Sequence, residues 1–412
     1  RQTQSISISS LLGAEQLKEY TRFIHTLEKE GKLNRELEFL PSDDELADRM
    51  AKGQGLTRPE LSILTAYGKM VLKERLVLPE IYENNYFKRQ LFAAFPQMLQ
   101  DKYAAEMETH PLKAEIIATK LANMMVNEMG PNFAQRMLEE TGAGVGEVTL
   151  CYAIARDLFD VSAMWRKIEQ LDNIIAASLQ SKLFHQLRRT MRRATRWFLR
   201  SRRNEQDAGR DTAHFGPHLA ALGLKLDELL EGPTREGWQT RYQAYTEAGV
   251  PELLARMVAG TTHLYTLLPI IEAADVTGHD AAEVAKAYFA VGSALDLPWY
   301  LQQISDLPVA NNWQAQAREA FRDDVDWQQR AITISVLQLC DSSVEARLDA
   351  WLAQHASMIE RWRAMLVEIR AASGTDYAMY AVANRELLDL ALSGQVAVPA
   401  QTAPANAELQ PA

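Results

Sequence analysis

Apolar residues recur at steps of three and four positions along almost the whole chain, which is the spacing of an amphipathic α-helix. Few stretches alternate with the two-residue period of a half-buried strand. The most strand-like stretch, 331–339, is flanked by helical patterning, so we interpret it as part of a buried helix. We therefore predict an all-α fold, a multi-helix array with no Rossmann sheet.

The same pattern predicts two long helices. One apolar stripe runs from Ser162 to about Arg203, which predicts a single helix of roughly 60 Å at the usual rise per residue. From Val344 to Ile369 the apolar residues alternate at four and three positions, as in a coiled-coil seam. This spacing leaves two partners open, an antiparallel helix of the same domain or another subunit. We expect His355, within the seam, to be a hydrogen-bonded polar residue.

One polar stretch marks a domain boundary. Residues 201–217 contain Gly and Pro and interrupt the helical pattern, which predicts a linker. The linker would separate residues 1–200, an N-terminal helical subdomain ending in a long basic helix, from a second helical subdomain at 218–394. Residues 395–412 are rich in Ala, Pro and Gln, and we expect a disordered tail.

The two predicted subdomains share a weak internal repeat. Shifting the segment that starts at Thr141 by 136 positions gives eight identities over thirty-one positions without a gap, among them Tyr152 with Tyr288 and Asp160 with Asp296. Shared helical spacing raises the number of such matches, so we treat the repeat as a hypothesis. Each copy would be a loop, a helix with an inward-facing tyrosine, and a second helix.

Composition and charge narrow the class of protein. The chain has 412 residues, of which 47% are hydrophobic and 24% charged, which is typical of a globular protein. Its net charge of −10 disfavours general binding of nucleic acid or other polyanions. The longest uncharged apolar run, 257–271, is short and contains Pro269 and several polar residues, so we predict no membrane span.

The cysteines and the first residue indicate a cellular compartment. Cys151 and Cys340 each lie in an apolar run where we expect burial, and two cysteines cannot form a disulfide framework. This usage fits a reducing cytoplasm. The chain begins at Arg1 with no charged-then-apolar leader, so we expect a piece of a longer protein without a signal peptide.

Two patterns resemble ligand sites without meeting their requirements. The glycine-rich stretch 141–148 follows a helical pattern rather than a strand, and Glu147 occupies the position of the third glycine, so we predict a helix–loop–helix connector. His214 and His218 lie four positions apart, but we expect Gly216 and Pro217 to block the helix that would align them. We therefore predict no catalytic, cofactor-binding or metal-binding residue in this chain.

One basic cluster is conspicuous. Residues 188–203 hold eight arginines and no acidic residue, and four of them are spaced to share one face of a helix. We interpret this face as pairing with acidic groups of the same polypeptide or subunit, with an anionic ligand as the alternative. A nucleic-acid or membrane surface is disfavoured on so acidic a chain. The candidate residues for anion or inter-domain contact are Arg188, Arg192, Arg193, Arg196 and Arg200.

Three long blocks, 33–69, 115–143 and 164–200, resemble the C-terminal region of the large bacterial NAD-dependent glutamate dehydrogenases. The first contains LNRELEFLPSDDELADRM, the second EIIATKLANMMVNEMG and the third MWRKIEQLDNIIAASLQSKLFHQLRR. The resemblance extends over about 1–394. It implies a parent enzyme that oxidatively deaminates L-glutamate to 2-oxoglutarate and ammonia and reduces NAD.

The resemblance also implies where the chemistry lies. The family's catalytic lysine and dinucleotide-binding glycines belong to a catalytic domain upstream of Arg1, so no residue here inherits their roles. The chain is then expected to be a non-catalytic helical region, with a structural, oligomerisation or regulatory role. Its expected partners are the catalytic domain of the same polypeptide and further copies in a homo-oligomer. The alternative is a helical adaptor that binds an anionic partner through the arginine face.

Overall fold

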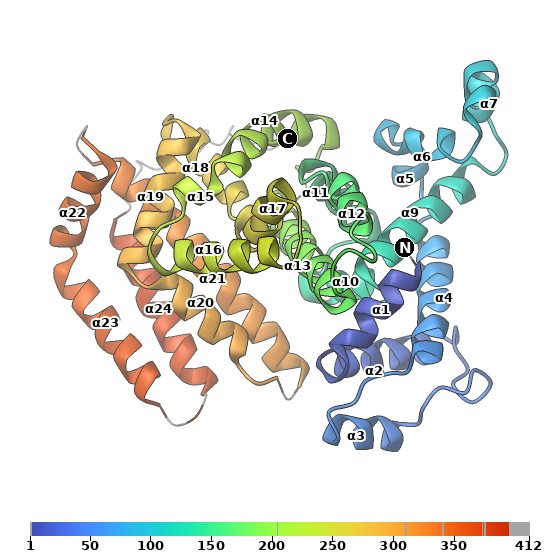
Figure 1. Cartoon of the computed structure of the whole chain (residues 1–412), viewed down its shortest axis with the longest axis horizontal. Helices are drawn as coiled ribbons and strands as arrows, with labels where there is room; N and C mark the ends of the chain where they lie inside the picture. The colour runs from blue at the N-terminus through green and yellow to red at the C-terminus, as the bar shows by residue number, and fades with distance from the viewer. Residues whose placement is uncertain are drawn as a thin grey trace, which may run out of the picture. The chain divides into compact units, whose positions relative to one another are not determined.

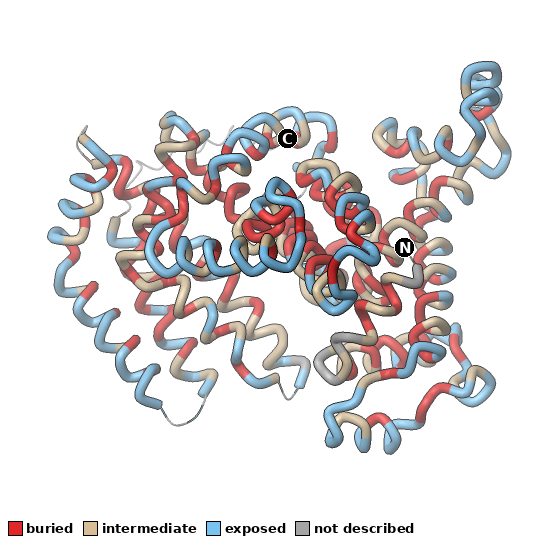
Figure 2. Tube along the Cα trace, viewed as in Figure 1, coloured by how far each residue is buried: buried red, intermediate tan, exposed pale blue. Residues whose placement is uncertain are grey.

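The computed structural model describes residues 2–394 except 204, 310, 340, 341, 373 and 375, so Cys340 and the tail at 395–412 lie outside the described residues. Over this range the chain forms twenty-four α-helices and one short 3-10 helix, with no strand (Figure 1). The predicted all-α fold is confirmed. Along most helices, buried positions alternate with exposed ones (Figure 2), as the three- and four-residue spacing requires.

By contacts the chain divides into two compact units, unit 1 with Arg1–Leu224 and Trp238–Leu268, and unit 2 with Lys225–Gly237 and Pro269–Ala412. Unit 1 extends to Leu224, past the predicted linker at 201–217. Helix α14 (Ala208–Leu224) begins within that stretch and continues through Pro217. Pro217 and Ala213 are both exposed. Water can therefore bind the Ala213 carbonyl that the proline leaves without an intrahelical donor.

Unit 1 is built around α13, whose apolar side packs against α1, α11 and α17, while α4 packs on α9. A second group of buried residues, including Leu17, Ile24 and Leu64, joins α2 to α4. The helices of unit 1 are α1 (Gln2–Leu12), α2 (Ala14–Lys29), α3 (Asp43–Ala51), α4 (Arg58–Arg75), α5 (Pro79–Tyr82), η1 (Asn85–Phe87), α6 (Lys88–Phe92), α7 (Gln97–Lys102), α8 (Ala104–Glu108), α9 (Lys113–Met129), α10 (Phe133–Thr141), α11 (Val145–Leu158), α12 (Val161–Glu169), α13 (Ala177–Ser201), α14, most of α16 (Gly232–Glu247) and α17 (Glu252–Leu264).

Unit 2 has a core rich in aromatic side chains, among them Tyr300, Trp351 and Trp362. Helix α21 packs against α19, α20 and α24, and α23 packs on α24. The helices of unit 2 are α15 (Leu226–Leu229), most of α18 (Leu267–Thr277), α19 (Ala281–Ala294), α20 (Leu297–Asp306), α21 (Asn312–Leu337), α22 (Val344–Gln354), α23 (Ala356–Ala371) and α24 (Tyr377–Ser393).

The prediction of one helix from Ser162 to Arg203 is wrong. The chain forms α12 and α13, joined by residues 170–176, in which Asn173 adopts a left-handed conformation with φ 61°. Gln180 Nε2 donates to the carbonyl of Ile168 at 2.9 Å and ties the two helices together. The connection also buries Leu171 and Ile175, so the apolar spacing continues across a break in the backbone.

The predicted helix from Val344 to Ile369 is also interrupted, at His355 between α22 and α23. The prediction of a hydrogen-bonded histidine is confirmed, because His355 Nδ1 lies 2.8 Å from the Trp351 carbonyl. The imidazole stacks on the Trp351 indole with ring centroids 4.2 Å apart. Trp351 and Trp362 belong to the core of unit 2, so these seam residues pack inside the unit.

The offset of 136 positions relates helix bounds as well as identical residues. Helices α11 and α19 begin and end 136 positions apart. The same offset separates the starts of α12 and α20, the ends of α13 and α21, and the starts of α14 and α22. Asp160 and Asp296, before α12 and α20, are both left-handed, with φ 42° and 55°. These bounds and left-handed conformations share one offset, and the internal repeat stays a hypothesis.

Candidate functional site

The candidate arginines of α13 lie in several different environments. Arg188 is buried, and its Nε donates to the Glu128 carbonyl at 2.6 Å while Nη2 donates to Ser5 Oγ at 2.8 Å. Burial lowers the pKa of Arg188 to about 10, although Tyr20, Glu128 and Tyr152 oppose the shift. Arg188 therefore fastens α13 to α1 and α9 inside unit 1.

Arg196 is the second buried member of the face. Its Nη1 lies 2.7 Å from Glu140 Oε2, and Arg136 binds the other oxygen of the same carboxylate. Arg193 lies over the ring of Tyr265, 4.9 Å from its centroid. Because the face includes buried pairs of unit 1, it is not one open anion-binding patch.

Arg192 and Arg200 complete the predicted set. Arg192 is half-buried and Arg200 is exposed on the same helix. Since the five arginines differ in burial and in partners, the structure gathers them on α13 without making them a single site. A role for them in binding an anion or another domain stays a prediction.

Sequence reasoning missed a buried network centred on Glu128, at the end of α9. Its carboxylate accepts from Tyr152 Oη at 2.6 Å and from Nε and Nη2 of Arg156 at 2.8 and 2.9 Å. Burial, with a smaller contribution from Glu128, raises the pKa of the Tyr152 phenol well above its usual value. Burial opposes the charge of Arg156, but the hydrogen bonds to Glu128 and the nearby charges together raise its pKa. A single acidic residue within the apolar run 121–129 was the available signal.

The network continues from Arg156 to a surface cluster. Tyr86 Oη donates to the Ala153 carbonyl at 3.1 Å and to the carboxylate of Asp157. The guanidinium of Arg89 pairs with Asp157 and lies 4.3 Å from the centroid of the Tyr86 ring. These bonds join the excursion α5–α8 to α11, so their evident role is to hold helices together.

The glycine-rich stretch is a helix–loop–helix connector, as predicted. Gly142 ends α10 in a left-handed conformation with φ 67°, and Gly144 precedes α11. The Gly144 amide donates to Glu147 Oε2 at 2.7 Å, so a glutamate in the first turn of α11 binds this exposed N–H group. Cys151, one turn later, is buried as expected, and burial raises the pKa of its thiol.

The reason given for dismissing His214 and His218 is wrong, because α14 runs unbroken between them. Their ring centroids lie 6.2 Å apart. Among the described residues, however, no group of three or more His, Cys, Asp and Glu side chains is arranged to hold a metal ion. No described helix combines the length and apolar character needed to cross a bilayer.

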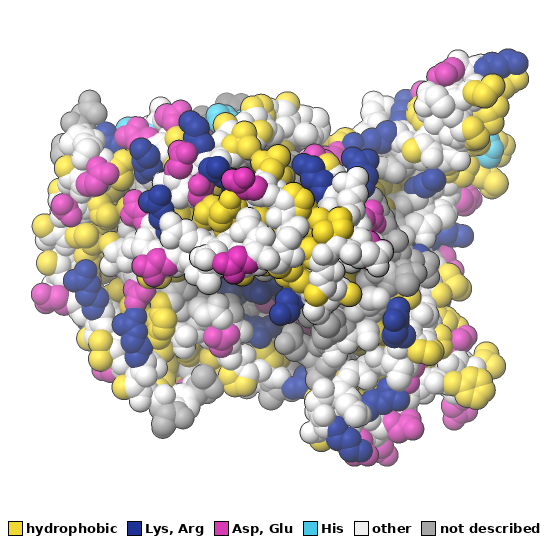
Figure 3. Space-filling view, viewed as in Figure 1, with side chains coloured by type: hydrophobic (Ala, Val, Ile, Leu, Met, Phe, Trp, Pro, Cys, Tyr) yellow, Lys and Arg dark blue, Asp and Glu magenta, His cyan; other side chains and the backbone are white. Residues whose placement is uncertain are grey.

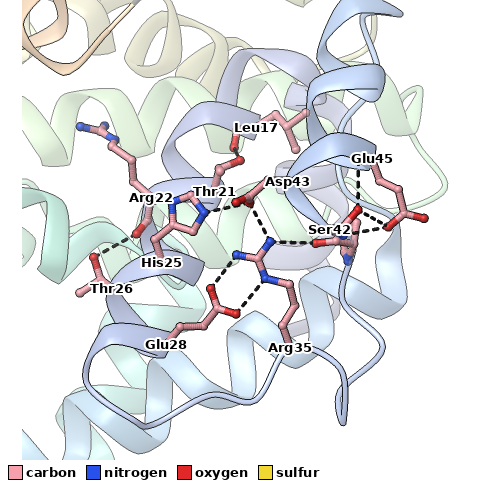
Figure 4. A network of polar contacts seen from close by, with 11 residues as sticks. Leu17, Thr21, Arg22, His25, Thr26, Glu28, Arg35, Ser42, Asp43 and Glu45 are labelled. Atoms are coloured by element: carbon pink, nitrogen blue, oxygen red, sulfur yellow. Dashed lines mark hydrogen bonds and ion pairs between the residues drawn. The ribbon is translucent and has the colours of Figure 1, made fainter.

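A further polar network lies at the surface of unit 1, between α2 and α3 (Figure 4). The Arg35 guanidinium binds Glu28 through Nε at 3.0 Å and Nη2 at 2.6 Å, and binds Asp43 Oδ1 through Nη1 at 2.7 Å. His25 Nε2 lies 2.8 Å from the same Asp43 oxygen. Hydrogen bonds from Arg35 and His25 lower the pKa of Asp43, so this carboxylate stays charged and holds both partners.

Comparison with known proteins gives consistent matches. Residues 53–389 match the family model described as "Glutamate dehydrogenase, C-terminal". The chain is 63% identical, over 96% of its length, to 24% of an NAD-specific glutamate dehydrogenase from Pseudomonas aeruginosa. It is 42% identical, over 96% of its length, to 25% of the protein of that name from Halomonas elongata. It is 34% identical, over 86% of its length, to 22% of the protein of that name from Mycobacterium tuberculosis. The chain thus spans about a quarter of the length of these relatives.

Proposed function

We propose, from the premise that the chain belongs to the glutamate dehydrogenase C-terminal family, that it is the helical region of an NAD-dependent glutamate dehydrogenase. The whole enzyme would oxidatively deaminate L-glutamate to 2-oxoglutarate and ammonia and reduce NAD. The observation that carries the proposal is 63% identity over 96% of this chain with a protein named NAD-specific glutamate dehydrogenase.

Within that enzyme we assign this region a structural role, in subunit assembly or regulation, and no catalytic step. Buried polar and charged groups need partners, and the two buried arginines of α13 already have them within unit 1. Arg188 donates to the Glu128 carbonyl and to Ser5 Oγ, and Arg196 pairs with the Glu140 carboxylate. A substrate dicarboxylate would have to displace these partners. The remaining three quarters of the relatives' length is where we place the NAD site and the catalytic residues.

The same pairs bear on the adaptor alternative. An adaptor would need the arginine face open to an anionic partner, whereas Arg196 already pairs with Glu140 and Arg193 lies on Tyr265. The catalytic domain of the same polypeptide is the partner that we favour, within a homo-oligomer. Exposed Arg200 remains a candidate contact residue toward that domain.

The test compares this chain with the full-length polypeptide that contains it. We expect glutamate-dependent reduction of NAD by the full-length protein, followed by the absorbance of NADH, and no NAD binding by this chain in calorimetry. Absence of turnover by the full-length protein would refute the assigned reaction. Binding or turnover by this chain would refute the non-catalytic role.

Light scattering on the same two samples tests the assembly role. If this region joins subunits, the chain forms the same oligomer as the full-length protein. A monomeric chain beside an oligomeric full-length protein would move assembly to other regions and leave regulation as the role of this one.

A further inference from the structure

The loop between α2 and α3 holds an unusual pair of exposed side chains. Leu37 is 72% exposed and Phe39 is 90% exposed, although both follow Leu33 and precede Leu40, which are buried. An exposed leucine alone is common on protein surfaces, but a fully exposed phenyl ring beside it is not. Some structural feature must therefore hold these two side chains in solvent while the neighbouring leucines are buried.

The backbone of the loop is fixed by its own hydrogen bonds. The Leu37 amide donates to Asn34 Oδ1 at 3.0 Å, the Glu38 amide to the Asn34 carbonyl at 3.1 Å, and the Leu40 amide to the Arg35 carbonyl at 3.0 Å. These bonds close two successive tight turns. The loop therefore has a defined conformation before any partner arrives.

Side chains fasten the loop to three helices. Arg35 reaches Glu28 in α2 and Asp43 in α3, and also donates to the Pro41 carbonyl at 3.3 Å (Figure 4). Pairing with Glu28 raises the pKa of Arg35, so the guanidinium stays charged. From α4, Tyr67 Oη donates to Glu38 Oε1 at 2.6 Å. The residues on both sides of Leu37 and Phe39 are thus held by polar contacts.

Phe39 itself has a backbone conformation that the phenyl group does not favour. Its φ is 52°, in the left-handed region where the side chain crowds the following carbonyl. The polar contacts of its neighbours therefore impose a conformation that directs an aromatic ring into solvent. Polar contacts here hold an apolar side chain in solvent instead of burying it. A side chain that is fixed in this way is preorganised to bind a partner.

We propose that Leu37 and Phe39 form a docking knob for an apolar pocket on the part of the glutamate dehydrogenase polypeptide that lies outside this region. The proposal rests on the proposed function. We choose this partner for the knob because about three quarters of the length of each relative lies outside the region that matches this chain. That larger part of the polypeptide offers the surface on which the knob docks. The exposed acidic residue Glu36 directly precedes Leu37 in the chain, so the pocket should have a basic group at its rim.

A second exposed apolar surface lies on α7, but it lacks the features that favour the knob of Leu37 and Phe39 as a docking element. Apolar side chains also gather at the tip that carries α7 (Figure 3), where Met98 is 83% exposed. Helix α7 has no buried residue of its own. The loop at 33–41 differs because its hydrogen bonds predefine the position of the apolar side chains.

The experiment uses the full-length polypeptide and its double variant Leu37→Ser/Phe39→Ser. Hydrogen exchange is followed by mass spectrometry in both. We expect the double variant to exchange at least tenfold faster at residues 36–40 and, at the same time, in one segment outside this region, the receiving pocket. The matched control is Val367→Ser/Val382→Ser, which alters two exposed valines of unit 2 (60% and 58% exposed) and should change neither segment.

Three outcomes would overturn the proposal. Equal exchange in wild type and double variant would show that nothing covers the knob. Protection that grows with protein concentration would identify a second copy as the occupant. Protection that appears only on addition of another protein would identify a separate partner. Failure of the proposed function is distinguishable, because it would appear as absent glutamate-dependent NAD reduction in the wild type, whatever the exchange pattern.

Discussion

Five of the eight bounds of the helices α11–α14 recur in α19–α22 at one offset, yet the two sets of helices are stabilised by different polar contacts. Both sets bury a tyrosine at the same position, Tyr152 in the first and Tyr288 in the second. Around Tyr152 lies the ion pair of Glu128 with Arg156. At the offset of 136, Gly292 in α19 corresponds to Arg156 in α11, so the second set lacks this guanidinium.

In the second set, the lack of a side chain at Gly292 leaves room for a hydrogen bond from Gln329. Gln329 Nε2 donates to the Tyr288 carbonyl at 2.9 Å, passing the backbone of Gly292. A Cβ atom at Gly292 would lie 2.6 Å from that nitrogen. The first set thus uses a carboxylate and a guanidinium where the second uses an amide and a glycine. Two sets of helices with several matching bounds can therefore hold their cores together with different polar groups.

The largest effect should come from removing the carboxylate at the centre of the charged core. Glu128→Leu leaves Arg156 and Tyr152 without the carboxylate that they bind, and we expect a loss of about 3–5 kcal/mol in the free energy of unfolding, measured by urea titration. Glu128→Leu/Arg156→Leu should recover most of that loss, because it removes both charges. A matched control is Glu360→Leu, at an exposed position of unit 2.

This cycle decides what the ion pair does. If the single variant costs less than about 1 kcal/mol, water or another acceptor reaches Arg156 and the network is not a closed core. If the double variant is as unstable as the single one, the geometry around Tyr152 requires the charges, and the two cores are not interchangeable.

A smaller effect should follow from adding a methyl group in the second set. Gly292→Ala displaces Gln329 from the Tyr288 carbonyl, and the lost buried bond exceeds the gain in helix propensity by about 1 kcal/mol. The control is Gly216→Ala in α14, where the nearest atom, Leu158 Cδ2, lies 3.9 Å from the added Cβ. Urea titration should show the control to be stabilised by about 0.5–1 kcal/mol. Equal stabilisation of both variants would contradict a tight approach at Gly292.

The features that were predictable from the sequence are those that depend on local spacing. Apolar residues at three- and four-residue steps sufficed for the all-α fold, and the glycines at 142 and 144 sufficed for the connector after α10. The breaks at 170–176 and His355 were missed for a physical reason. A tight connection that buries Leu171 and Ile175 preserves the apolar spacing, so periodicity alone cannot distinguish it from a continuous helix.

The partners of the candidate residues depend on distant parts of the chain and were not predictable. The arginine face was visible as a charge pattern, but Glu140 lies 56 positions before Arg196 and Ser5 lies 183 positions before Arg188. Only packing decides which charges meet, because each has many acceptors available in a sequence. The exposed Phe39 was missed similarly, since an apolar residue in a helical pattern predicts burial.

The smallest effect tests whether the two sets share the turn before their second helix. Glycine has no Cβ to crowd the left-handed conformation, and part of this gain is offset by its greater freedom in the unfolded chain. Asp160→Gly should therefore raise the free energy of unfolding by about 0.5 kcal/mol. Asp296→Gly relieves the same crowding but also loses the ion pair with Arg370, which is partly exposed. Since such a pair contributes about 0–1 kcal/mol, the net change at 296 should be near zero.

Removing the ion pair isolates the turn itself. In an Arg370→Ala background, Asp296→Gly should give the same increase of about 0.5 kcal/mol as Asp160→Gly, measured by urea titration of all four proteins. Equal values would mean that both aspartates carry the same backbone strain at the same point of the repeat. If the two values differ by more than about 0.5 kcal/mol, the left-handed turns are only superficially alike. The shared offset would then reflect helix lengths rather than a common turn, and the hypothesis of an internal repeat would lose its most specific support.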